Sequence, residues 1–163
     1  MLTFMFVLVL LVASAIFSGS ETALTAASRA RMHALENEGD ERAREVNRLL
    51  AHPERIIGTV LIGNNLVNIL ASSLMTGLLI GLFGEVGIAY ATIGMTVLIV
   101  IFSEVLPKTY AFAFPDRIAL AVAPVMRVLI VLLHPFTAAA SFVVRQLLRL
   151  SPSKVDDEAN ILA

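Results

Sequence analysis

Oxygen-bearing side chains recur inside three long apolar stretches of this sequence, and several of them share one face of a helix. The residues are Ser18, Glu21, Thr22 and Thr25 in the first stretch, Asn64, Asn65 and Asn68, which follow Gly63, in the second, and Ser103 and Glu104 in the third. Hydroxyl, amide, carbonyl and carboxylate oxygens are hard ligands, which suit Mg²⁺, Ca²⁺ or Na⁺ better than zinc or copper. We therefore predict an oxygen-lined cation site among these stretches.

Glu104 is the sharpest of these candidates. A carboxylate deep in a bilayer costs on the order of a few kcal/mol unless it is paired or solvated, so it is a functional candidate by default. The structural alternative is an ion pair with Lys108, which lies four residues later in the sequence. For Ser18 and Thr22 the alternative is ordinary contact between helices through small polar side chains.

The expected depths of these residues in a bilayer support a shared site. At about 1.5 Å of rise per residue, Ser18 and Glu104 lie about 24 Å below the outer edge of the bilayer, and Asn64 lies about 18 Å below it. Ser20 lies about 200° from Ser18 around a regular helix, so both face one point only if the helix distorts between them. Gly63 and Pro107 are expected to free backbone carbonyls from helical hydrogen bonding.

The amino-acid composition indicates that the stretches carrying these residues lie in a membrane. Of the 163 residues, 58% are apolar and 15% charged, and the net charge is −1. Soluble domains usually contain about 45–50% apolar and about 25% charged residues, so we expect an all-α integral membrane protein. The balanced charge gives no basic footprint for nucleic acid, and without cysteine there is no disulfide or thiolate site.

Three stretches are long enough to span a bilayer as helices, about residues 2–27, 56–83 and 86–114. The first lacks the basic start of a secretory signal, so we predict a retained helix. Residues 117–150 are apolar but are broken by Pro124, Arg127 and Pro135, which favours short or re-entrant juxtamembrane helices over a fourth span. Residues 1–150 would then form one transmembrane domain, and residues 151–163 have the composition of a linker to cytosolic domains.

Charge counting predicts the orientation. Residues 29–55 carry six arginines with acids at helical spacing, whereas the turn at residues 84–87 carries only Glu85. The positive-inside rule places the arginine-rich connection, expected to be a solvated helical hairpin, in the cytoplasm and the turn outside. The N-terminus is then outside and the C-terminus cytoplasmic, with the residue 117–150 helices as a belt on the cytoplasmic side.

Three sequence motifs together resemble the membrane domain of the CorC/cyclin-M (CNNM) magnesium transporters. They are FSGSETA at residues 17–23, LIGNNLVN at residues 61–68 and FSEVLPK at residues 102–108, and the resemblance covers about residues 1–150. It implies a homodimer in a bacterial inner (plasma) membrane, three spans per protomer and a juxtamembrane belt. It also implies Mg²⁺ export in exchange for Na⁺, and cytosolic CBS-pair and CorC-type domains that bind ATP and follow in the chain.

The resemblance also implies roles for individual residues. Ser18, Asn64 and Glu104 match the positions associated with Mg²⁺, the Gly63 carbonyl is a fourth donor, and Ser20 and Asn68 are further ligands. We expect alternating access, with Na⁺ competing for the same oxygens.

Two other classes of function are weighed against transport. An intramembrane serine hydrolase is disfavoured because all three histidines lie in connections or at a helix break, so we expect no enzyme activity. The other alternative is a dimeric anchor or regulator for a cytosolic nucleotide-sensing module, with the GxxxG motif at residues 77–81 as a helix contact.

Overall fold

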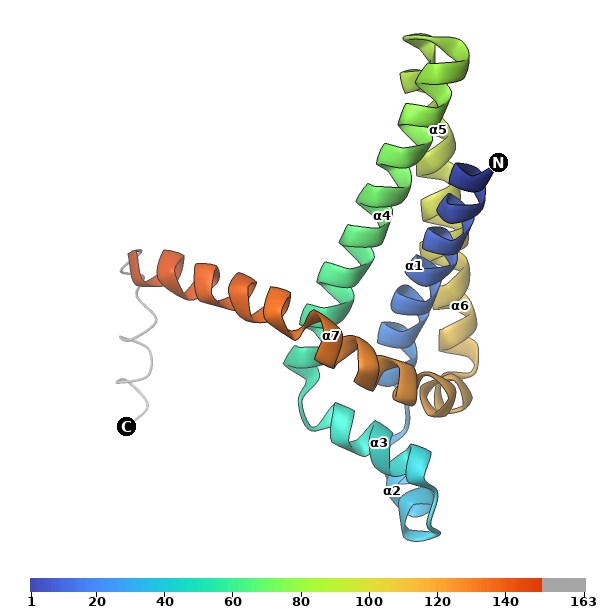
Figure 1. The fold of residues 1–163 in the computed structure, drawn as a ribbon. Helices are drawn as coiled ribbons and strands as arrows, with labels where there is room; N and C mark the ends of the chain where they lie inside the picture. The colour runs from blue at the N-terminus through green and yellow to red at the C-terminus, as the bar shows by residue number, and fades with distance from the viewer. Residues whose placement is uncertain (151–163) are drawn as a thin grey trace, which may run out of the picture.

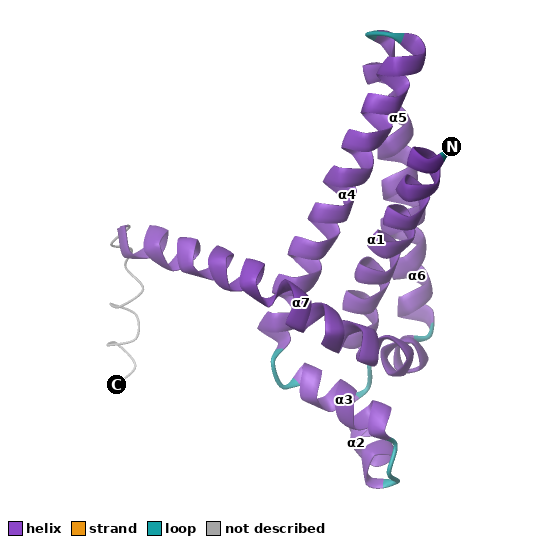
Figure 2. Cartoon of the chain, viewed as in Figure 1, coloured by secondary structure: helices purple, strands orange, loops and turns teal. Residues whose placement is uncertain are grey.

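The computed structural model describes residues 1–150, with side chains for residues 1–146, and contains no strand in that part of the chain. Its elements are α1 (Leu2–Ala26), α2 (Arg29–Asn37), α3 (Glu41–Leu50), α4 (Pro53–Phe83), α5 (Val86–Leu98), the π-helix η1 (Ile99–Val105), α6 (Leu106–Ala113) and α7 (Pro115–Leu150). Figure 2 shows that helices account for nearly all of the described chain. The predicted all-α fold is confirmed.

Three long helical columns stand side by side (Figure 1). They are α1, α4 and the continuous run of α5, η1 and α6, and each is long and apolar enough to cross a membrane. Their bounds agree with the three predicted apolar stretches within a few residues. Helix α4 begins at Pro53, three residues before the apolar stretch itself, since proline suits the first turn of a helix, where its missing N–H needs no partner.

The expectation of several short helices over residues 117–150 is wrong. These residues belong to the single helix α7, which runs through Pro124 and Pro135. Each proline removes one helical hydrogen bond and bends the helix, but the remaining bonds continue on both sides. Helix α7 also has the length and hydropathy of a span, so four helical stretches in the described part of the chain meet these criteria. In Figure 1, however, α7 runs across the ends of α1 and α4, and its second half projects away from the bundle.

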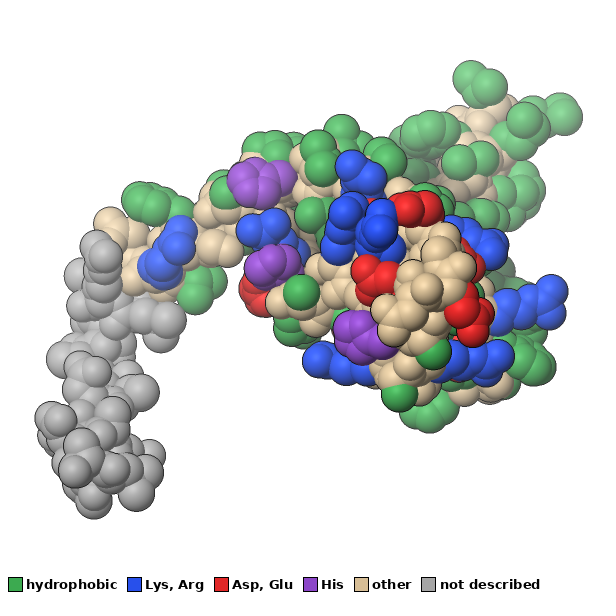
Figure 3. Space-filling view, turned by 90° about the horizontal axis from the view of Figure 1, so that it is seen from below, with side chains coloured by type: hydrophobic (Ala, Val, Ile, Leu, Met, Phe, Trp, Pro, Cys, Tyr) green, Lys and Arg blue, Asp and Glu red, His purple; other side chains and the backbone are tan. Residues whose placement is uncertain are grey.

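Most of the charged side chains gather at the end of the molecule formed by α2, α3, the start of α4 and α7, which we call the charged end (Figure 3). The helical hairpin predicted for the arginine-rich connection is confirmed as α2 and α3. Arg31 lies 3.2 Å from Asp116 and Arg127 lies 3.6 Å from Glu45, so ion pairs tie α7 to both helices. Asp40 caps α3, and its side-chain hydrogen bond with Arg42 holds the pKa of that carboxyl below its usual value.

Two apolar clusters hold the helices together. The larger one joins α1, α2, α3, α4 and α7 near the charged end and includes Leu24, Met32, Val46, Ile56 and Met126. The smaller one joins α1, α4 and α5 further toward the turn at residues 84–85 and includes Val7, Leu10, Leu11, Ala71, Met75 and Met95. On α4, Asn64, Asn65 and Asn68 lie between buried members of the two clusters, whereas on α1 Ser18 directly follows Phe17 of the larger cluster.

The α4–α5 hairpin supplies a stability test. A Cβ atom at Gly87 would overlap the backbone carbonyl of Leu79, whereas a Cβ at Gly94, also on α5, would meet open space. We expect Gly87→Ala to destabilise the protein by about 1–3 kcal/mol, because backbone cannot move aside as a side chain can. Thermal unfolding in detergent should therefore show a lower midpoint for Gly87→Ala than for Gly94→Ala. Equal midpoints would contradict this helix pairing.

Candidate cation site

The polar face of α1 points toward α4. Ser14 and Ser18 lie four residues apart and share a face, and both are buried. The Ser14 hydroxyl donates a hydrogen bond of 2.6 Å to Oδ1 of Asn64 on α4. The Ser18 hydroxyl, one turn further along, is buried and has no hydrogen-bond partner among the described residues.

The asparagines of α4 divide into two kinds. Asn64 and Asn68 share a face, since they lie four residues apart, and the Oδ1 atom of Asn68 is buried without a hydrogen-bond partner in the described chain. Asn65 is exposed, and its amide donates to the Leu61 carbonyl of its own helix at 2.8 Å. Asn64 and Asn68 therefore face the interior of the bundle, as the predicted ligand set requires, and Asn65 does not.

Gly63 allows α1 and α4 to approach closely. A Cβ atom at this position would overlap the ring of Phe17, which is itself buried. Helix α4 continues unbroken from Pro53 to Phe83, so the expectation that Gly63 interrupts helical hydrogen bonding is not met. The role of its carbonyl as a metal donor stays a prediction.

The third column changes its helical register at the predicted site. Ile99–Val105 form a π-helix, and the N–H of Leu106 donates to the carbonyl of Ile101, five residues back. Pro107 follows, and because it has no N–H it cannot donate to the Ser103 carbonyl as an α-helix would require. The loosening expected near Pro107 is thus present as a π-helix, a feature that recurs at functional sites.

Ser103 and Glu104 lie within this π-helix. The Ser103 hydroxyl is buried and donates to the Leu11 carbonyl at 3.1 Å, which anchors η1 to α1. Glu104 is half-buried. Across residues 1–146 its carboxylate forms no ion pair with Lys108, so the structural alternative is absent from this structure.

Ser20 occupies a different side of α1. The helix stays regular from Leu2 to Ala26, so Ser20 and Ser18 lie about 200° apart. Ser20 shares its face with Ala23, Leu24 and Ala27, which belong to the apolar cluster that includes α7. Its hydroxyl is buried without a partner among the described residues. Ser20 as a ligand of the same ion stays a prediction, and a regular α1 does not turn it toward Asn64.

Neutral oxygens of α1 and α4 and the carboxylate of Glu104 on η1 lie in the same three-helix bundle. Oγ of Ser18 and Oδ1 of Asn68 are buried without a hydrogen-bond partner among the described residues, as is Oγ of Ser20 on the other side of α1, and the carboxylate of Glu104 is half-buried. No group of three His, Cys, Asp or Glu residues that could hold a metal occurs in the described part of the chain. Such a set suits a hard cation that keeps some of its water, and it does not suit zinc.

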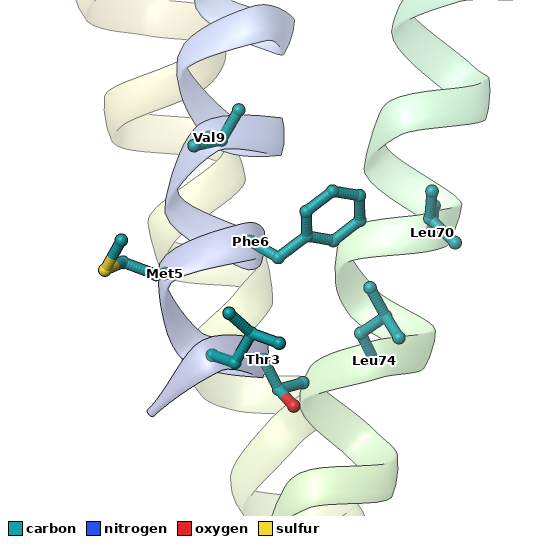
Figure 4. A pocket seen from close by; sticks show the side chains of 7 residues that line it. Thr3, Met5, Phe6, Val9, Leu70 and Leu74 are labelled. Carbon is teal, nitrogen blue, oxygen red and sulfur yellow. The ribbon is translucent and has the colours of Figure 1, made fainter.

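An apolar crevice between α1 and α4 is a poor alternative for a cation. Its volume is about 490 Å³, and it lies near the N-terminus (Figure 4). The side chains that line it are Leu2, Thr3, Met5, Phe6, Val9, Leu70 and Leu74. Thr3 supplies the single side-chain oxygen in this lining, so a cation would not be stabilised there.

Two contributing residues were not among the predicted ligands. Ser14 fixes the amide of Asn64, and Ser103 fixes the π-helix against α1. The spacing of Ser14, four residues before Ser18 on the same face, is the signal that would have identified it. The sequence singled out Ser103 as an oxygen-bearing residue beside Glu104, but it did not indicate that the Ser103 hydroxyl would bind the Leu11 carbonyl.

Comparison with known proteins supports the resemblance noted from the three motifs. The sequence-family model of the cyclin M transmembrane N-terminal domain matches residues 5–161 of this chain. The UPF0053 inner membrane protein YfjD of Escherichia coli K12 is 41% identical over 143 residues, which cover 88% of this chain and 33% of that protein. A UPF0053 protein of Haemophilus influenzae is 31% identical over 160 residues, covering 98% of this chain and 38% of that protein.

A more distant relative carries a functional name. The polyamine export protein of Haemophilus influenzae is 28% identical over 137 residues, which cover 76% of this chain and 32% of that protein. The chain thus spans about a third of the length of these relatives. With a family model matching nearly all of its residues, this chain belongs to the cyclin M (CNNM) transmembrane domain family.

Proposed function

We propose that this chain is the membrane domain of a Mg²⁺ transporter. The proposal rests on two buried oxygens, on Ser18 and Asn68, that have no hydrogen-bond partner among the described residues and lie in the bundle that also holds Glu104. Buried polar atoms in native proteins are nearly always satisfied, so exceptions call for a water or an ion. The Ser14–Asn64 hydrogen bond places Ser18 and Asn68 about two helical turns apart on antiparallel helices, so a hydrated cation would reach at least one of these oxygens through its waters, and it would balance the charge of Glu104.

The donor types favour Mg²⁺ as the cargo. Magnesium requires a small octahedral oxygen shell and usually keeps several waters, so one carboxylate with a few neutral oxygens is an adequate protein contribution. In this proposal Glu104 supplies the charge, and Ser18, Asn64, Asn68 and the Gly63 carbonyl replace lost waters. Ser20 would join only if α1 distorts during transport.

We further propose Na⁺-coupled export by alternating access. Na⁺ is also a hard cation, and its competition for the same oxygens would favour release of Mg²⁺. The π-helix is the natural point of movement, since its hydrogen bonds are already rearranged next to Pro107. The positive-inside rule would place the charged end in the cytoplasm of a bacterium with this chain in its inner membrane. A homodimer and ATP-binding CBS-pair and CorC-type domains complete the proposal.

Two other functions remain as outcomes of the tests. A dimeric anchor or regulator without transport would need no ion at Glu104. Polyamine export, the function named for one relative, requires a site for an extended polycation. The described donor set, with Glu104 as its acidic member, favours a compact ion over such a substrate.

Mg²⁺ binding to the purified chain tests the site. We expect Glu104→Gln to weaken Mg²⁺ binding at least about 100-fold, because a unit charge beside a divalent cation in a partly buried site contributes several kcal/mol. Glu85→Gln is the matched control, since Glu85 is exposed in the α4–α5 turn. Calorimetry with Mg²⁺, Na⁺ and spermidine gives the comparison. Equal Mg²⁺ affinity in both variants would favour the anchor, and saturable spermidine binding without Mg²⁺ binding would favour polyamine export.

Removing the Ser18 hydroxyl separates a ligand from a packing contact. We expect Ser18→Ala to leave the metal-free protein unchanged or to stabilise it by up to about 1 kcal/mol, because a buried hydroxyl without a partner is lost. The rise in melting temperature caused by Mg²⁺ should shrink. Asn68→Ala should also reduce that rise, and Asn65→Ala, its exposed neighbour, should not. If Ser18→Ala destabilises the metal-free protein and leaves the Mg²⁺ effect intact, then Ser18 is a helix contact and not a ligand.

A further inference from the structure

A groove lies between the first turns of α4 and the distal part of α7, away from the cation site. Its volume is about 560 Å³. Its lining residues are Glu54, Arg55, Gly58, Leu61 and Ile62 of α4 and His134, Thr137, Ala138, Ala140, Ser141, Val144 and Arg145 of α7. A Cβ atom at Gly58 would lie 3.8 Å from the Thr137 methyl group, so the two helices nearly touch at the floor of the groove.

The polar side chains of distal α7 share one helical face. His134, Thr137, Ser141 and Arg145 follow one another at spacings of three and four residues, which aligns them. Their neighbours on α7 include Phe136, Phe142 and Val143, which are large, apolar and exposed. Helix α7 is therefore amphipathic here, and its polar face is the one that lines the groove.

The groove has a positive character. Arg55 and Arg145 form no ion pair with any residue whose side chain the structure describes. Glu54 is the one acid in the lining, and it lies 3.5 Å from His52. Helix α4 begins at Pro53, next to the groove, and the side chain of its N-cap residue, His52, makes no hydrogen bond to the first turn. The positive end of the helix dipole therefore adds to the positive charge of the two guanidinium groups.

The rim of the groove is apolar. Leu61 and Val144 line it and are 61% and 53% exposed. A free anion gains nothing from these side chains, whereas a phospholipid places its phosphate among basic groups and its acyl chains along apolar ones. Basic pockets between helices at a membrane surface are a recurrent form of anionic lipid recognition.

We propose that this groove binds the headgroup of an anionic phospholipid. Arg55 and Arg145 contact the phosphate from opposite sides, Ser141 and His134 supply further polar contacts, and the acyl chains lie along Leu61 and Val144. The lipid then bridges α4 and α7, which fixes the projecting half of α7 at the membrane surface. This proposal does not depend on the identity of the transported ion.

Native mass spectrometry and thermal unfolding of the full chain in detergent test the proposal. Phosphatidylglycerol and phosphatidylcholine with the same acyl chains are added separately, and inorganic phosphate is a third arm. We expect phosphatidylglycerol to bind more tightly and to raise the melting temperature more than phosphatidylcholine, and phosphate alone to do neither.

The variants locate the site. Arg145→Gln should weaken phosphatidylglycerol binding about fivefold, Arg55→Gln should act in the same direction, and Arg145→Lys should retain most of the binding. Arg29→Gln is the control, because Arg29 is exposed at the start of α2 and is not in the lining. Arg145 is exposed, so its replacement should not impair folding. Equal binding of the two lipids, unchanged binding in Arg145→Gln, or equal stabilisation by inorganic phosphate would overturn the proposal.

Discussion

The close packing of α1 against both of its long neighbours is the constraint on which the rest of the structure depends. Phe17 lies against Gly63 of α4, and Gly19 faces Pro107 of α6. At this short range Ser14 reaches Asn64 on one side. These contacts bury the hydroxyl of Ser18. Its lack of a hydrogen-bond partner within the described chain costs about 1–3 kcal/mol of folding free energy. Such a cost is tolerated where the packing around it is tight and a ligand can relieve it.

Much of this arrangement can be predicted from the sequence. The thickness of a bilayer sets the length of a spanning helix, and the rise per residue sets the depth of each residue in the bilayer. The three apolar stretches had to be helices, since an irregular chain cannot satisfy its backbone in lipid. The depth estimate put Asn64 about one helical turn, about 6 Å, outward of Ser18. The observed hydrogen bond from Ser14, one turn before Ser18, agrees with that level.

Other features depend on contacts between helices, which a single sequence does not reveal. The prolines of α7 suggested interruptions, but a helix packed by Ala119, Ala123 and Met126 against the bundle continues through them. Pro107 indicated a loosened helix, while the extent of the π-helix depends on hydrogen bonds that run to Ile101. The sequence did not decide whether Ser20 faces the same point as Ser18. The structure decides it, because α1 is a regular helix that places the two residues on different sides.

The most direct measurement of the central claim is the position of a bound cation in the protein. Mn²⁺ shares the oxygen preference of Mg²⁺, and its anomalous scattering identifies it in crystals grown with Mn²⁺. The account predicts one strong peak between α1, α4 and the π-helix, within bonding distance of Glu104 and of Ser18 or Asn68, that added Mg²⁺ removes. A peak confined to the acids of the charged end, or none within the bundle, would contradict it.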